Sequence, residues 1–251
     1  RVVGVTPFCV YPPEATAKPK IGGFLDPNYK AILALKPDRI FGLSSHRDHR
    51  AHLKQVGLDL TILPMNAIPE IIDAIRAVGS ICGVESQSDR LMGSIEARMA
   101  KLRNAPKRAS PLCVMICIGR DYRKDALDQV TIAGTGSFHD GIIALAGGIN
   151  AYRGPAIEYP AVSFEGILAM DPDVIVELRP GESLTEADRE RSLAAWRNPV
   201  GLRAASSRRI AIWTEPHVSI PGPRFIDIAE ALADLLRENP SGKESPDVHV
   251  P

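Results

Sequence analysis

Short apolar runs rich in β-branched residues alternate along the chain with segments whose apolar side chains recur at helical spacing. The runs predict buried parallel strands over residues 2–5, 39–43, 61–63, 112–118, 174–178 and 209–213. The segments between them predict helices over residues 29–35, 47–56, 69–82, 85–104, 138–145 and 186–196, and a helix from Pro223. This alternation predicts an α/β fold with mainly parallel sheets flanked by helices.

An internal repeat divides this pattern into two halves. Residues 28–41 (NYKAILALKPDRIF) align with residues 163–176 (SFEGILAMDPDVIV), an offset of 135 residues (28 against 163). Each copy is followed by a predicted helix, a strand and a helix that starts at a proline, Pro69 or Pro223. The shared order of elements predicts two related α/β lobes.

The segment between the lobes predicts one long helix. Residues 85–104 lack proline and carry a single apolar stripe, and a helix of that length spans about 30 Å. Because one continuous helix permits only small tilts, it would join the lobes rigidly. The predicted division is an N-terminal lobe over 1–82, a connecting helix over 83–106, a C-terminal lobe over 107–238 and a polar, proline-rich, disordered tail over 239–251.

Composition narrows the class of protein. The 251 residues include 30 Lys and Arg against 30 Asp and Glu, so the chain lacks the basic excess of a nucleic-acid-binding protein. No apolar run approaches the roughly 18–20 residues that span a bilayer. The chain starts at Arg1 rather than Met, which is compatible with a processed upstream segment such as a secretory signal.

The cysteines favour a structural role. Cys113 and Cys117 lie on one predicted strand about 13 Å apart, too far for a disulfide, and Cys9 and Cys82 stand alone. Since no CxxC spacing occurs, we expect all four to be small buried side chains.

The sequence lacks the common catalytic motifs. A nucleophile elbow, a P-loop lysine motif and an HExxH zinc helix are all missing from the sequence. The stretch Gly134-Thr135-Gly136-Ser137 resembles a phosphate loop, but its spacing favours glycines for a turn and Ser137 as a helix N-cap. His46, His49 and His52 recur every third residue and offer a metal site, which the neighbouring lysine and arginines disfavour; a solvated helix face is the alternative.

Candidate ligand-binding residues follow the predicted strands or lie in loops and at element starts. Ligands in open α/β sheets bind beyond the carboxyl ends of the strands. Aromatic residues make up only 5% of the chain, yet several fall in such positions, as a wide apolar ligand with polar edges requires. The candidates are Phe8, Tyr11, Phe24, Ser45, His46, Arg120, Tyr122, Phe138, Arg179, Glu215, His217 and Arg224.

Taken together, these segments resemble a known family. The two repeated lobes around a long helix, Gly22-Gly23-Phe24, the stretch 28–38, Tyr11-Pro12-Pro13, Phe138-His139-Asp140 and Pro221-Gly222-Pro223-Arg224 are similar to the helical-backbone substrate-binding proteins of ABC importers. The likeness extends from Val2 to about Leu236 and is nearest to the cobalamin-binding members.

The resemblance implies capture of cobalamin or a related corrinoid in a cleft between the lobes, without catalysis and without a resident cofactor or metal. Tyr11 and Phe24 would clasp the ligand from one lobe, and Tyr122 and Phe138 from the other. Haem is an alternative ligand, with His46 or His217 on the iron. A ferric siderophore is another, held by Arg120, Arg179 or Arg224.

The resemblance also implies partners and a location. The protein would be a monomer in the periplasm or on the extracytoplasmic face of the membrane, and would deliver its ligand to an ABC permease. Its contact with the membrane would be through that permease or through an N-terminal lipid. Family lobes each carry a surface glutamate for that contact; Glu165 matches, whereas Lys30 stands in the first copy, where Asp26 or Glu14 would have to substitute. Family members also open with a strand-helix unit ahead of the one that begins here at Val2.

Two other classes remain open. Nitrogenase-type enzymes also repeat α/β lobes around a cleft, but they need cysteines at cluster spacing, which this sequence does not supply. A zinc or manganese binder of the same superfamily would use His46, His49 and His217.

Overall fold

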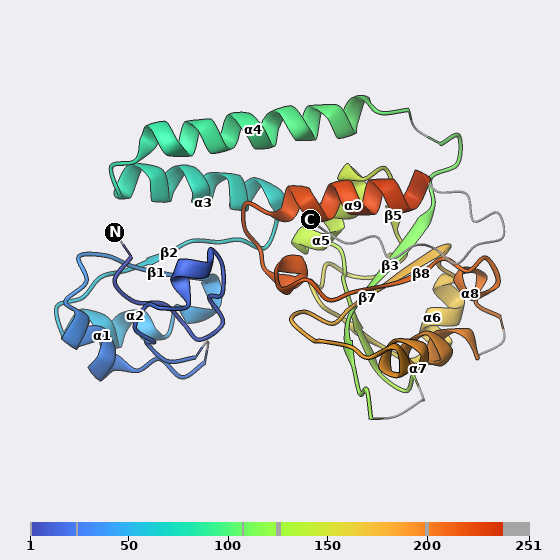
Figure 1. The fold of residues 1–251 in the computed structure, drawn as a ribbon, viewed down its shortest axis with the longest axis horizontal. Helices are drawn as coiled ribbons and strands as arrows, with labels where there is room; N and C mark the ends of the chain where they lie inside the picture. The colour runs from blue at the N-terminus through green and yellow to red at the C-terminus, as the bar shows by residue number, and fades with distance from the viewer. Residues whose placement is uncertain (1, 24, 107, 124–126, 199–200, 238–251) are drawn as a thin grey trace. The chain divides into compact units, whose positions relative to one another are not determined.

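The computed structural model describes residues 2–23, 25–106, 108–123, 127–198 and 201–237, and the chain divides into two compact units (Figure 1). Unit 1 is Arg1–Pro64 and unit 2 is Met65–Pro251. Phe24 and the predicted tail over 239–251 lie outside the described residues.

Unit 1 is a small α/β unit with a small core. Its elements are η1 (Pro13–Ala15), α1 (Tyr29–Leu35), β1 (Ile40–Gly42), η2 (Ser44–His46), α2 (His49–Gln55) and β2 (Leu60–Ile62). The two strands pair in parallel, and Ile32, Leu53 and Leu60 form the buried cluster. The predicted helix over 47–56 is shorter, because a 3-10 turn and two linking residues precede α2.

The predicted strand over residues 2–5 is wrong. Only Val5 pairs, in a single parallel bridge with Lys20, while Val2 and Val3 are exposed. β-Branched residues favour extended backbone, but a strand also needs a neighbouring backbone along its length. In unit 1 the described chain offers these valines no such neighbour.

Unit 2 is a sheet covered by helices on both faces (Figure 1). Its strands are β3 (Cys113–Arg120), β4 (Val130–Ile132), β5 (Ile149–Asn150), β6 (Ala161–Val162), β7 (Val174–Leu178) and β8 (Ile210–Trp213). Its helices are α3 (Ile68–Ile81), α4 (Glu85–Asn104), α5 (Phe138–Leu145), α6 (Phe164–Met170), α7 (Glu186–Arg197), α8 (Arg203–Ser206), η3 (Pro216–Ser219) and α9 (Phe225–Arg237).

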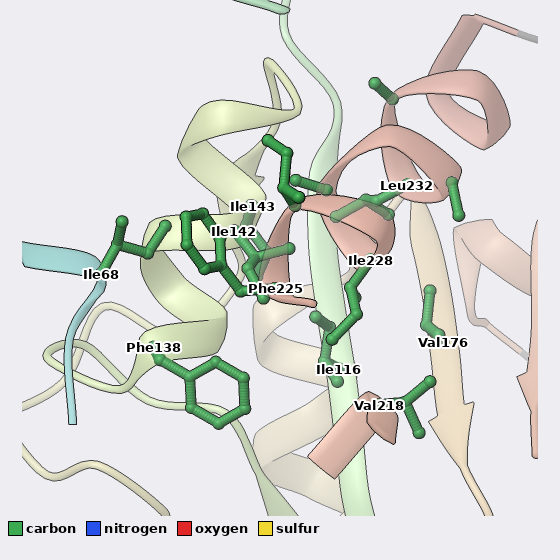
Figure 2. Packing of buried hydrophobic residues seen from close by; sticks show 14 of the residues in the cluster. Ile68, Ile116, Phe138, Ile142, Ile143, Val176, Val218, Phe225, Ile228 and Leu232 are labelled. Carbon is green, nitrogen blue, oxygen red and sulfur yellow. The ribbon is translucent and has the colours of Figure 1, made fainter. Parts of the chain in front are cut away.

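The described strands run in the order β6-β4-β3-β7-β8, and β5 also pairs with β3. The pairs β3–β5, β3–β7 and β7–β8 are parallel, which confirms the predicted sheet, whereas β4 is antiparallel to both β3 and β6. Alternate residues of β3 face opposite cores, as the period of a strand requires. Ile116 packs under α5 and α9 (Figure 2), and Val114 belongs to the same cluster, whereas Met115 packs under α6 and α7.

The internal repeat is confirmed element by element. α1 and α6 each have seven residues, and each is N-capped by a side chain, Asn28 or Ser163, that accepts a hydrogen bond from the backbone three residues on. Each helix ends at a left-handed residue, Lys36 (φ 46°) or Asp171 (φ 41°), and a proline and a strand follow. The pairs Ile40–Leu60 and Ile175–Ile210 then set the same parallel register in both copies.

The boundary between the units differs from the predicted lobes. The division falls after Pro64 rather than after residue 82, because α3 packs along α4, and both belong to the core of unit 2. Met92, Ile95 and Met99 of α4 lie in the same buried cluster as α9. Residues 85–104 do form the predicted helix, but it is packed into unit 2 over its length.

The cysteines are only partly as predicted. Cys117 is buried and Cys9 and Cys113 are half-buried, but Cys82 is exposed at the end of α3. All four are free thiols. Cys82 is exposed because the chain turns there between two surface helices, where little packs against it.

Candidate functional site

The carboxyl ends of β3 and β7 carry a buried ion-pair network in unit 2. The Glu177 side chain is fully buried, and its Oε2 accepts hydrogen bonds from Arg120 Nε at 3.0 Å and from Trp196 Nε1 at 2.5 Å. Arg120 is itself only 3% exposed, so both charges have left water and depend on one another. This pairing fixes the direction of the Arg120 side chain at the end of β3.

Tyr122 and Arg179 complete the network. The guanidinium carbon of Arg179 lies 3.8 Å from the centre of the Tyr122 ring, and that of Arg120 lies 4.9 Å from it, so two cations share one aromatic ring. Tyr122 Oη donates to the backbone oxygen of Leu178 at 3.2 Å. Burial and the nearby carboxylate of Glu177 raise the pKa of Tyr122, so its hydroxyl stays protonated.

Arg179 is already engaged within unit 2. Its Nε and Nη2 bind the carboxylate of Glu182 at 3.0 and 2.5 Å, and its Nη1 donates to Ser192 Oγ at 2.9 Å. Glu182, whose side chain is 44% exposed, therefore competes with a ligand anion for this guanidinium.

A polar depression adjoins Arg120 on the same edge of the sheet. Its volume is about 570 Å³. Its lining consists of Gly119, Arg120, Asp121, Asp128, Gln129, Thr131 and Ala161. Both signs of charge line it, so it suits a polar ligand group better than an apolar ring.

The segment after β8 brings a second set of candidates together. η3 holds His217, which is 4% exposed, and Val218, whose backbone oxygen lies 2.8 Å from His139 Nε2 of α5. Burial and the positive charge of Arg224 lower the pKa of His217, while Glu215 and Asp227 oppose them. Glu215 and Arg224 thus lie close enough to His217 to act on its charge.

Phe138 lies in the core. It is 1% exposed and belongs to the same buried cluster as Val218 and Phe225 (Figure 2). The Phe138 ring is packed among apolar side chains of this cluster, so the structure does not support the predicted clasp by Phe138. The neighbouring His139 ring stacks on it, with centres 3.9 Å apart.

The glycine-rich loop before α5 has a structural role. Ser137 is the predicted N-cap and accepts from the backbone nitrogen of Asp140. Gly134 lets another loop approach, since a Cβ there would lie 2.0 Å from the backbone oxygen of Ile157. The Ser137 hydroxyl also donates to the Gly134 backbone oxygen, so the loop is closed by its own hydrogen bonds.

In unit 1 the predicted aromatic residues are at the surface. Phe8 is 67% exposed and Tyr11 is 60% exposed, and Val10 between them is also exposed. The Tyr11–Pro12 peptide bond is cis. Large exposed apolar side chains clustered in one segment are typical of a binding surface.

The histidines of unit 1 surround a tyrosine. Tyr29 Oη lies 2.7 Å from His49 Nδ1, and the Tyr29 ring packs on His52 with centres 4.3 Å apart. His46 Nδ1 accepts from the Leu43 backbone nitrogen at 3.0 Å and so closes the turn after β1, next to the exposed Ser45. No group of three or more His, Cys, Asp or Glu side chains in the described ranges is placed to hold a metal ion.

The two candidate docking residues occupy equivalent places. Lys30 and Glu165 are each the second residue of a repeat helix, and both are exposed. Hydrogen bonding to Ser163 lowers the pKa of Glu165, so this carboxylate stays ionised at neutral pH. The two copies therefore present opposite charges.

Sequence reasoning missed Glu177, Trp196 and Glu182, which organise the candidates around them. The signal for Glu177 is a single charged residue inside the apolar run VIVEL of β7, since a charge in a buried strand requires a partner. Trp196 and Glu182 carry no comparable signal, because their role depends on contacts distant in sequence.

Comparison with known proteins decides the family. The Periplasmic binding protein family matches residues 1–213, which is most of the chain. The chain belongs to this family. Membership places this periplasmic binding protein in the periplasm or on the extracytoplasmic face of the membrane, among proteins that bind substrates for transport. None of its described helices is long and apolar enough to cross a membrane.

Several known proteins are similar over nearly the whole chain. A "Vitamin B12-binding protein" of Vibrio cholerae is 23% identical over 94% of this chain and 82% of its own length. An "Uncharacterized ABC transporter substrate-binding lipoprotein" of Bacillus subtilis is 23% identical over 94% and 73%. The structure of the periplasmic haem-binding protein RhuT from Roseiflexus sp. RS-1 superposes with a TM-score of 0.73 at 27% identity, over 94% of this chain and 91% of RhuT.

Proposed function

We propose that this periplasmic binding protein is the substrate-binding component of an ABC importer and captures cobalamin or a related corrinoid. The observation that carries the proposal is the alignment over 94% of the chain with a relative named for vitamin B12 binding. The exposed aromatic residues of unit 1 support it, since a corrin ring is a wide apolar surface. The protein would bind its ligand without changing it chemically and without a resident cofactor.

Phe8 and Tyr11 are the proposed apolar contacts in unit 1. Burying an aromatic side chain against a ligand contributes about 1.5–3 kcal/mol, so loss of either ring should weaken binding about tenfold or more. In unit 2 the proposed contacts are Tyr122, Glu215 and Arg224, at the carboxyl edge of the sheet, and the buried Arg120 would position Tyr122. The cleft that the family resemblance implies between the lobes stays a prediction.

Titration calorimetry with cyanocobalamin, haem and a ferric siderophore tests the ligand. We expect tight binding of cyanocobalamin and a weaker response to the other two. Phe8→Ala and Tyr11→Ala should each lower the affinity, while Leu91→Ala, a change at a 40% exposed apolar residue of α4, should not. Binding of haem or siderophore in place of cyanocobalamin would reject the corrinoid assignment.

Haem is the second candidate ligand, because RhuT, a haem-binding protein, is 27% identical to this chain. His46 or His217 would then supply an imidazole to the iron. Of these, His46 already uses Nδ1 to accept from Leu43. A shift of the haem absorption band that is lost in His217→Ala, but kept in His46→Ala, would favour this assignment.

The exposed faces of the two repeat helices, α1 and α6, are the proposed docking surfaces for a permease. Glu165 would meet a basic partner residue, and Lys30 an acidic one, because the two positions carry opposite charges. The protein would act as a monomer, tethered by its permease or by an N-terminal lipid. Glu165→Lys should weaken a pull-down of the cognate permease, and Lys30→Glu should do the same.

A further inference from the structure

Four buried polar atoms at the end of β8, in the segment after it and in the α5 residue that contacts this segment have no partner among the described residues. His139 Nδ1, Trp213 Nε1, His217 Nε2 and Ser219 Oγ have no hydrogen-bond partner among the described residues. Three of these side chains are more than nine-tenths buried: His139 is 1% exposed, Trp213 2% and His217 4%. Native proteins pair roughly 90% or more of such groups, because an unpaired one carries a free-energy penalty.

These atoms belong to one small region, which we call the η3 subsite and define by His139, Trp213, His217 and Ser219. Trp213 ends β8, and His217 and Ser219 belong to η3 a few residues later. His139 is joined to the same turn through its 2.8 Å contact with the Val218 backbone oxygen. Val218 belongs to the buried cluster that also contains Phe138 and Phe225 (Figure 2).

The chemistry of the atoms defines the group they can take. The Val218 carbonyl only accepts, so His139 Nε2 carries the proton and Nδ1 is an acceptor. Burial lowers the pKa of His139 to about 4, so the ring is neutral at pH 7. Trp213 Nε1 only donates, and the Ser219 hydroxyl does both. A primary carboxamide offers a donor and an acceptor together, whereas a carboxylate offers acceptors only.

We propose that the η3 subsite binds a carboxamide group of the transported ligand. This inference rests on the proposed function and narrows it, because corrinoids carry carboxamide side arms and haem carries carboxylates. The Tyr159 ring lies edge-on to His139 with centres 6.2 Å apart and is 39% exposed. Its displacement would open the subsite to the ligand.

The experiment compares cyanocobalamin with its monocarboxylic acids, in which one carboxamide is hydrolysed. Affinities are measured by calorimetry, and the midpoint of thermal unfolding is measured without ligand. Wild-type protein should prefer cyanocobalamin to the acid of the bound arm by about tenfold or more. Ser219→Ala should lower the affinity for cyanocobalamin and shrink that preference, with an unchanged or raised unfolding midpoint, because an unpaired hydroxyl is removed.

Ser206→Ala is the matched control, since that hydroxyl is already paired with the Leu202 backbone oxygen at 3.2 Å. It should leave the affinity and the preference unchanged. Trp213→Phe is the second variant. Its readout is the preference for cyanocobalamin over the acid, because a packing defect would lower the affinity for both ligands alike.

Two outcomes overturn the inference, and they are distinguishable. If wild-type protein binds cyanocobalamin and both variants keep its affinity and preference, the η3 subsite serves only the fold and the proposed function stands. If wild-type protein does not bind cyanocobalamin, the proposed ligand is rejected and this inference falls with it.

Discussion

A single buried carboxylate organises the candidates at the edge of the sheet in unit 2. Glu177 holds Arg120 and Trp196 directly, and its Oε1 lies 3.9 Å from Arg179 Nη1. A buried ion pair gives little net stability compared with an apolar core, but losing one partner leaves an uncompensated charge. Glu177 is therefore a positioning residue for the arginines around it.

Glu177→Gln should lower the free energy of unfolding by about 3–5 kcal/mol, because Arg120 would stay buried without its counter-charge. Urea unfolding followed by Trp196 fluorescence measures the loss. Glu182→Gln is the control. Loss of its more exposed ion pair should lower the free energy of unfolding by about 1 kcal/mol or less. Equal losses in the two variants would contradict the assignment.

A buried histidine makes the stability depend on pH. Burial lowers the pKa of His139 to about 4, while the unfolded chain keeps a value near 6.5. Between those values the unfolded state binds a proton that the folded state does not, so stability falls as the pH falls from about 6.5 to about 4.

Urea unfolding at pH 7 and pH 4.5 should show this loss, about 2–3 kcal/mol from His139 alone. His139→Gln should remove that part of the pH dependence, and His52→Gln, at an exposed histidine, is the control. The same pH slope in wild-type protein and His139→Gln would exclude His139 as its source.

At the scale of elements, the two repeat helices end in the same strained way. Lys36 and Asp171 adopt left-handed backbone, which costs a residue with a side chain about 1–2 kcal/mol relative to glycine. Asp171 is compensated, because its carboxylate accepts hydrogen bonds from the Arg203 backbone nitrogen at 3.1 Å and from Arg203 Nη2 at 2.6 Å. The side chain of Lys36 is exposed.

Lys36→Gly should therefore raise the free energy of unfolding of unit 1, by up to about 1 kcal/mol. Asp171→Gly should not stabilise unit 2, since it removes the contacts with Arg203. Chemical denaturation of both variants measures the difference. A destabilised Lys36→Gly would show that its side chain contributes more than the backbone strain.

At the scale of the whole molecule, the units have very unequal cores. Unit 1 has three fully buried apolar residues in its cluster, whereas two large clusters line the faces of the sheet in unit 2. Because stability rises with buried apolar area, unit 1 should unfold at the lower temperature.

Calorimetry should resolve two transitions. Leu53→Ala, in the core of unit 1, should shift the first by an amount equivalent to about 2–5 kcal/mol, and Leu232→Ala of α9 should shift the second. One transition that moves as a whole in both variants would show that the units unfold together.

Local pattern predicted several elements to the residue. The bounds of α1, α4, α5 and β7 match the expected ranges, because caps, helical spacing and a β-branched run are read within a few neighbouring residues. The strand expected over residues 2–5 was wrong, since a strand depends on a partner that its own residues do not specify.

By itself, the sequence determined the repeat, the helices that build it and the resemblance to the family that the comparisons then confirmed. Only the tertiary structure decided that α3 and α4 belong to unit 2, that Phe138 faces the core and that four buried polar atoms in and near η3 have no partner among the described residues. The physical reason is that these contacts join residues that are far apart in the sequence. Arg120 and Glu177 are 57 residues apart, and His139 and Val218 are 79 apart, so their partners are chosen by the fold and not by neighbouring residues.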